Sequence, residues 1–155
     1  MKTTLEVIIA LLSSGGDFGL TILLAGIGSS IGLYKAGVAV FYIFQYQKQA
    51  EGKVDSSLAV FALFPSSQTL YGIGLSIFLA LNKVPMFQSI LIGLFAGGAI
   101  MISAICQGMI CAHGINSMGK ANEGKPQTLM IAGAIEFVAL ATMGISMVLA
   151  LFLKG

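Results

Sequence analysis

Long stretches without charged residues, separated by short polar segments, are the main pattern in this chain. The charge-free stretches cover 18–34, continuing past Lys35 to 47, then 56–82, 84–119, and 126–153 apart from Glu136. About 20 apolar residues are enough for a helix to cross the hydrocarbon core of a bilayer. The pattern therefore predicts four transmembrane helices, over about 7–46, 56–82, 85–119 and 126–153. Four crossings return both termini to the same side of the membrane.

Composition agrees with a membrane location. The chain of 155 residues is 57% hydrophobic and 9% charged, and its mean hydropathy is +0.96. A soluble domain of this length does not have enough interior to hide that much apolar surface. The predicted fold class is therefore an all-α membrane protein in contact with the lipid bilayer. The net charge is +2 and the basic residues are scattered, which argues against a nucleic-acid partner.

The lysines predict the orientation, because the chain contains no arginine. Lys48 and Lys53 lie in the connection near 45–56, and Lys120 and Lys125 lie in the connection near 119–126, whereas the middle connection holds only Lys83. Cytoplasmic loops of membrane proteins are enriched in positive charge. We therefore expect a multi-pass protein of the cell membrane with both connections in the cytoplasm and both termini outside.

An internal repeat divides the chain into two similar halves. The segment GLSIFLAL at 74–81 matches GISMVLAL at 144–151, and the small residues Gly28, Gly32 and Ala36 match a second series in the third helix. The repeat predicts two tandem helical hairpins, 1–82 and 83–155, inserted in the same orientation. Small residues at every fourth position allow close helix packing. This packing would either pair helices within one chain or build the inner wall of a ring from the first and third helices.

Glu136 is the only charged residue between Lys125 and Lys154. A carboxylate at the centre of a membrane helix costs roughly 2.5–3.5 kcal/mol, so we expect a function or a partner for it, and reversible ion binding is the favoured hypothesis. By the helical rise of 1.5 Å per residue, Glu136, Gln68 and Gln107 all lie roughly 15–18 Å from the cytoplasmic ends of their helices. Buried amides need hydrogen-bond partners, which these three side chains can supply to one another.

The second helix carries further oxygen atoms in the segment FPSSQTLYG at 64–72. Phe64, Ser67 or Gln68, and Tyr71 fall on one helix face. Pro65 has no N–H and loosens the preceding turn, which frees backbone carbonyl groups. Carboxylate, amide, hydroxyl and carbonyl oxygens suit a small alkali cation, whereas a proton carrier needs only the carboxyl group. Hydrogen bonds that merely lock the helices together are the alternative for each amide.

These segments resemble the proteolipid subunit, also called c or K, of rotary V-type ATPases. The resemblance is carried by GIGSSIG at 26–32, FPSSQTLYG at 64–72, ICQG at 105–108 and AIEFVAL at 134–140, and it is greatest to the bacterial members that translocate sodium. It implies a homo-oligomeric rotor ring that carries ions during ATP-driven rotation. The implied partners are a stator membrane subunit of the a/I type, whose essential arginine meets Glu136, and a central-stalk subunit at the cytoplasmic loops.

The resemblance also implies a Na⁺ site in this chain. Its ligands would be the Glu136 carboxylate, the side chains of Gln107, Gln68 and Ser67, and the backbone oxygen of Phe64. Tyr71 would donate a hydrogen bond to the carboxylate and hold the site closed. Ser67 stands where the sodium members commonly have threonine, so the hydroxyl is retained. The chain has no phosphate-binding motif, and we expect a non-catalytic subunit.

Three other interpretations stay open at this point. The same rotor could carry H⁺, with the two glutamines as structural amides. A small ion-coupled secondary transporter also fits four helices and one membrane glutamate, although the parallel repeat argues against it. A purely structural pore-forming proteolipid is the third. Outside the predicted site, we expect Asp17 near the outer end of the first helix and His113 to be a packing residue.

Overall fold

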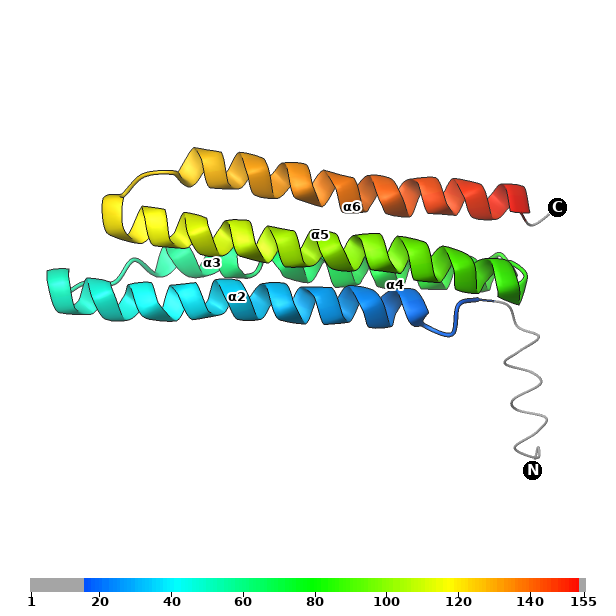
Figure 1. Ribbon diagram of the computed structural model, residues 1–155, viewed down its shortest axis with the longest axis horizontal. Coiled ribbons are helices and arrows are strands. Elements are labelled where there is room, and N and C mark those ends of the chain that lie inside the picture. The colour runs from blue at the N-terminus through cyan, green and yellow to red at the C-terminus, as the bar shows by residue number, and fades with distance from the viewer. Residues whose placement is uncertain (1–15, 154–155) are drawn as a thin grey trace, which may run out of the picture.

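The computed structural model describes residues 16–153, and within that range the protein is helical without any strand (Figure 1). The long helices are α2 (Leu20–Glu51), α4 (Ser67–Leu81), α5 (Met86–Ala121) and α6 (Lys125–Leu153). The short elements η1 (Ser56–Leu58), α3 (Ala59–Ala62) and η2 (Phe64–Ser66) lead into α4. Four segments are long and apolar enough to cross a membrane, namely Leu20–Ala50, Ser56–Leu81, Met86–Ala121 and Lys125–Leu153. The prediction of an all-helical chain with four such segments is therefore confirmed.

Consecutive long helices run in alternating directions along one bundle axis (Figure 1). Short connections over 52–55, 82–85 and 122–124 join them. The first and last described residues consequently lie at the same end of the bundle, and the α2–η1 and α5–α6 connections lie together at the opposite end.

The helices α2 and α5 pack backbone against backbone. A Cβ atom placed on Gly108 would lie 2.3 Å from the Cα atom of Gly32, and one placed on Gly28 would lie 2.6 Å from the Cα atom of Met101. These separations are far shorter than van der Waals contact, so the two backbones touch and no larger side chain fits between them. The small-residue series found in the sequence thus pairs two helices of the same chain.

The first long helix differs from its predicted bounds at both ends. It begins at Leu20 instead of about residue 7, because residues 17–19 are not helical; the predicted stretch before residue 16 lies outside the described residues. Phe18 and Gly19 have positive φ angles of 53° and 75°, which a continuing α-helix does not tolerate. At the other end α2 continues past residue 46 to Glu51 and stops at Gly52, whose φ of 70° is typical of a helix C-cap.

The second membrane segment, predicted as one helix over about 56–82 with a loosened turn before Pro65, is divided into several helical elements around that residue. Its helical turns change from α3 to the 3₁₀ turn η2 and back to α4 within residues 59–67. Proline cannot donate a hydrogen bond to the preceding turn, and its ring crowds that turn. Pro65 is fully buried against α2, where its ring lies beside Gly32. The break therefore lies inside the bundle, and the backbone carbonyl group of Pro65 points to α2, where it accepts a hydrogen bond from Ser29.

Candidate functional site

The Glu136 carboxylate lies between three helices. Glu136 belongs to the middle of α6 and is half-buried. Its Oε1 atom accepts a hydrogen bond of 2.7 Å from the hydroxyl group of Tyr71 in α4. Its Oε2 atom accepts one of 3.2 Å from Nε2 of Gln107 in α5. Both donors are neutral, and neither brings a positive charge that would compensate an ionised carboxylate.

The two glutamines extend this contact into a buried polar chain. Gln107 and Gln68 are both fully buried. Nε2 of Gln107 also donates to the backbone oxygen of Ala132 at 3.1 Å, one turn before Glu136. Its Oε1 atom accepts a hydrogen bond of 3.1 Å from Nε2 of Gln68. The hydrogen bonds show that the acid and the two amides occupy one layer of the bundle.

One oxygen atom at the end of this chain is left without a partner. Among residues 16–153, Oε1 of Gln68 is buried and accepts no hydrogen bond. A buried polar atom without a partner costs about 1–3 kcal/mol, and such atoms are rare in folded proteins. An amide oxygen of this kind is a ready ligand for a cation, since a bound positive charge would replace the missing donor. This orphan oxygen is the observation in the site that most directly points to a ligand.

Ser67 and Phe64 form a second pair of oxygen atoms next to this chain. The Ser67 hydroxyl group donates to the backbone oxygen of Phe64 at 2.9 Å. Ser67 immediately precedes Gln68 at the start of α4, and Phe64 begins the preceding turn η2, so the pair and the amide lie together at the η2–α4 junction. Within the described range, no hydrogen bond joins this pair to Glu136. The structure thus gathers the six predicted residues into two adjacent groups, a carboxylate–amide–tyrosine chain and a carbonyl–hydroxyl pair.

Two serines that the sequence analysis did not select hold the backbone on either side of the site. Ser29 in α2 donates to the backbone oxygen of Pro65 at 2.6 Å. Ser103 in α5 donates to the backbone oxygen of Ile135 at 2.9 Å, directly before Glu136. Serines on a small-residue helix face often donate to a neighbouring helix in membranes, and this rule is the signal that could have singled them out.

Asp17 and His113 lie apart from the Glu136 site. Asp17 is only 2% exposed. Its carboxylate accepts hydrogen bonds from the backbone N–H groups of Gly19 and Thr21, from the Thr21 hydroxyl group and from the Ser76 hydroxyl group. It therefore caps the start of α2, at the end of the helix where the sequence predicted it. His113 is exposed, and its Nδ1 atom lies 2.8 Å from the backbone oxygen of Met109 in its own helix, so it does not pack in the core.

The donor set of the site suits a hard cation. Over the described part of the chain, no three His, Cys, Asp or Glu side chains come together as a metal cluster. The Glu136 site instead offers one carboxylate together with amide, hydroxyl and carbonyl oxygen atoms. Hard cations such as alkali and alkaline-earth ions prefer oxygen ligands of these kinds. A single carboxylate would balance the charge of one monovalent ion.

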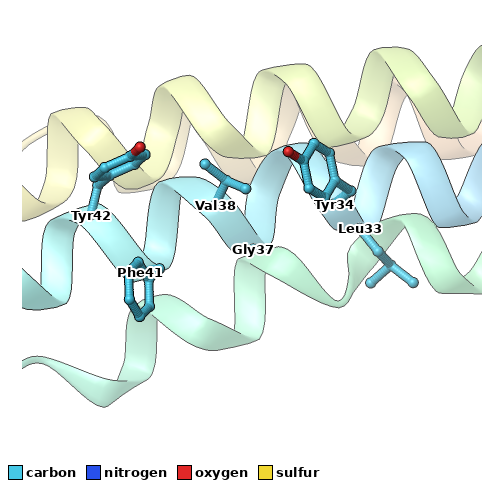
Figure 2. A pocket seen from close by; sticks show the side chains of 6 residues that line it. All are labelled: Leu33, Tyr34, Gly37, Val38, Phe41 and Tyr42. Carbon is cyan, nitrogen blue, oxygen red and sulfur yellow. The ribbon is translucent and has the colours of Figure 1, made fainter.

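A groove on α2 is separate from this site (Figure 2). It is lined by residues of α2 alone: Leu33, Tyr34, Gly37, Val38, Phe41 and Tyr42. Tyr34, Phe41 and Tyr42 are all exposed, at 72%, 61% and 63%. The groove contains no acidic residue and is an apolar surface feature of the bundle.

No protein-family model matches this chain, and no curated protein matches it. The functional interpretation therefore depends on the sequence motifs and on the geometry around Glu136.

Proposed function

We propose that this chain is a rotor-ring subunit of the membrane sector of a V-type ATPase and that it carries Na⁺ at Glu136. The observation that carries the proposal is the buried polar chain of Glu136, Gln107 and Gln68, which ends in an amide oxygen without a hydrogen-bond partner. Three of the four motifs that resemble the V-type proteolipid contain these residues, at 64–72, 105–108 and 134–140. The resemblance gives the site its proposed task, and the geometry supplies suitable ligands.

Sodium would bind among oxygen atoms from three helices. Glu136 supplies the charge, Gln68 supplies its free Oε1 atom, and Ser67 and Phe64 supply the adjacent oxygen pair. The Oε1 atom of Gln107 would turn from Gln68 to the ion. Tyr71 keeps its hydrogen bond to Glu136 and holds the carboxylate in the closed position. The ion is the cargo of the subunit, and each of these side chains binds or orients it without forming a covalent bond.

The charge of Glu136 explains how such a subunit would move ions in one direction. With Na⁺ bound, the carboxylate is neutralised and tolerates contact with lipid. Without the ion, the anion is costly in the membrane and is stable only beside a positive charge, which the stator arginine would provide. Moving one charge against 100 mV costs about 2.3 kcal/mol, and ATP hydrolysis in a separate soluble sector would supply this energy.

Assembly into a ring follows from the same proposal. The two hairpins would stand side by side, with α2 and α5 on the inner wall and α4 and α6 outside. The close contact of α2 with α5 and the broad apolar surface of α6 support this arrangement. The α2–η1 and α5–α6 connections would face the cytoplasm and the central stalk, and both termini would lie outside.

The same rotor carrying protons is the second candidate. The hydrogen bond between Gln68 and Gln107 supports it, because these amides already stabilise each other without an ion. In that case the orphan Oε1 atom of Gln68 would have no role in transport, and only the carboxyl group of Glu136 would exchange with solvent.

Modification of Glu136 by a hydrophobic carbodiimide distinguishes the two candidates. The reagent attacks the protonated carboxyl group, so its rate in the purified oligomer reports how often Glu136 carries a proton. We expect Na⁺ to slow the reaction, and to do so more strongly at higher pH, because Na⁺ and H⁺ compete for one site. Potassium and choline salts are the controls. A rate that is the same in all three salts would contradict sodium transport and favour protons.

The variant Gln68→Leu sharpens this experiment. It removes the orphan oxygen and the hydrogen bond to Gln107 but leaves the Tyr71 contact in place. We expect the Na⁺ concentration that protects Glu136 in this variant to rise about tenfold. This corresponds to the loss of one ligand worth about 1.4 kcal/mol. Its dependence on pH in the absence of sodium should remain. Unchanged sodium protection in this variant would mean that Gln68 is only a structural amide.

A further inference from the structure

The broken turn at Pro65 is held by three serine hydroxyl groups. The Ser66 hydroxyl group donates to the backbone oxygen of Leu63 at 2.6 Å, and that of Ser67 donates to Phe64 at 2.9 Å. The third comes from another helix, since Ser29 of α2 donates to the backbone oxygen of Pro65 at 2.6 Å. Three successive carbonyl groups, at 63, 64 and 65, thus each have a hydroxyl partner.

The partner of the Pro65 carbonyl group is buried and fixed. Ser29 is 3% exposed, and Pro65 has almost no exposed surface. One turn later in α2, a Cβ atom on Gly32 would lie 2.8 Å from Cβ of Pro65, so the proline ring fills the space beside that glycine. Because both residues of α2 contact the same proline, the broken turn cannot shift along α2 without losing a buried hydrogen bond.

We infer that Ser29 is a positioning residue that prepares the cation site by occupying the Pro65 carbonyl group. With that carbonyl group bound to α2, the oxygen of Phe64 and the hydroxyl group of Ser67 remain as the pair that lies next to Gln68. This role rests on the proposed function of the Glu136 site. Ser29 itself would not touch the ion, and it would act only through the backbone of residues 64–67.

The neighbouring serine provides a matched control. Ser30 is exposed, and its hydroxyl group donates to the backbone oxygen of Gly26 at 2.8 Å, within its own helix. Ser29→Ala and Ser30→Ala therefore remove the same atom from consecutive positions of α2. Only the first removes a hydrogen bond to the broken turn.

The test measures two quantities for Glu136 in the purified full-length oligomer. One is the Na⁺ concentration that halves the rate of carbodiimide modification at a fixed pH. The other is the pH dependence of the rate without sodium. For Ser29→Ala we expect the sodium concentration to rise about tenfold, as for the loss of one buried hydrogen bond. The pH dependence should stay as in the wild type, because the Tyr71 and Gln107 contacts of Glu136 are unchanged. Ser30→Ala should match the wild type in both quantities.

If Ser29→Ala does not assemble into an oligomer, two other variants test the same role, because their side chains have the same shape. Ser29→Thr keeps the hydroxyl group and Ser29→Val replaces it with a methyl group, while both add the same bulk. We expect Ser29→Thr to bind sodium more tightly than Ser29→Val. If the same Na⁺ concentration halves the modification rate of Glu136 in both variants, the positioning role of Ser29 is overturned.

The outcomes distinguish a failure of the Ser29 role from a failure of the proposed sodium function. If the wild type is protected by sodium and Ser29→Ala is protected equally well, Ser29 has no positioning role and the proposed function stands. If Ser29→Ala changes the pH dependence together with the sodium response, the substitution disturbs the whole site, which also overturns a specific role. If sodium does not protect the wild type at all, the proposed sodium function fails, and the inference about Ser29 fails with it.

Discussion

Asp17 and Glu136 are two carboxylates inside one apolar bundle, and their surroundings differ. Asp17 is 2% exposed and accepts hydrogen bonds from two backbone N–H groups and two hydroxyl groups. Glu136 is half-buried and accepts hydrogen bonds from one tyrosine and one glutamine. The donors around Asp17 are mostly part of the helix start itself, whereas those around Glu136 come from two other helices.

Under the proposed function, this difference separates a structural acid, Asp17, from an acid that binds and releases an ion, Glu136. Four hydrogen-bond donors surround the carboxylate of Asp17 at the N-terminal end of α2, so its oxygen atoms have partners without a cation. Around Glu136 there is no helix end, and the polar chain contains the unpartnered Oε1 atom of Gln68. The Glu136 carboxylate therefore receives fewer hydrogen bonds from its own protein than Asp17 does, and under the proposed function a bound ion would complete the site.

The largest expected effect comes from replacing Glu136 itself. In Glu136→Gln the carboxyl group is gone, so carbodiimide modification at this position and any response to sodium should be lost completely. Peptide mapping of the wild type by mass spectrometry should place the label on Glu136 and none on Asp17, because Asp17 is buried and its carboxylate is enclosed by hydrogen-bond donors. Asp17→Asn serves as the control and should leave the Glu136 rate unchanged. Equal labelling of Asp17 and Glu136 would contradict the prediction that only Glu136 reacts.

A smaller effect, on stability alone, is expected from Asp17. In Asp17→Ala the helix loses its cap, worth about 0.5–2 kcal/mol, and the buried hydroxyl groups of Thr21 and Ser76 lose an acceptor. Together these losses should lower the free energy of unfolding by about 2–4 kcal/mol. Thermal unfolding in detergent measures this change. Asp17→Asn should be milder, since asparagine is also a good cap. A loss of sodium protection in either variant, in protein that remains assembled, would indicate that Asp17 contributes to transport.

The two acids also show how far the sequence alone could lead. The position of Glu136 in a charge-free run, and the helical rise that puts it level with Gln68 and Gln107, depend only on regular helix geometry. That geometry holds along α5 and α6, and the three side chains are joined by hydrogen bonds. The burial of Asp17 depends on non-helical residues 17–19 folding against α4 and α5, which no local pattern encodes.

Ser29 and Ser30 illustrate the same limit at single-residue scale. Both are serines in one glycine-rich helix, and a serine in a membrane helix can donate either to its own backbone or to a neighbour. Ser30 does the first and Ser29 the second. The choice is decided by which helix face meets Pro65, and this depends on the break in the second membrane segment. Pro65 locates that break in the sequence, but the sequence does not fix the orientation of the broken turn against α2.

The smallest expected effect concerns a third acid, Asp55, which lies outside the membrane segments in the connection after α2. Hydrogen bonds from the side chain and the backbone N–H of Ser57 hold the pKa of Asp55 below its ordinary value of 3.8. A carboxyl group whose pKa is lower in the folded state stabilises the fold above its unfolded pKa, and this contribution is lost as the pH falls through the lowered pKa.

Asp55→Asn keeps the cap without the charge. The wild type should therefore be the more stable protein at pH 6, by less than about 1 kcal/mol because the site is exposed, and lose this advantage as the pH drops below about 4. Thermal unfolding of both proteins across this range measures the difference. A difference that does not change with pH would show that the Asp55 charge does not contribute to the stability of the fold.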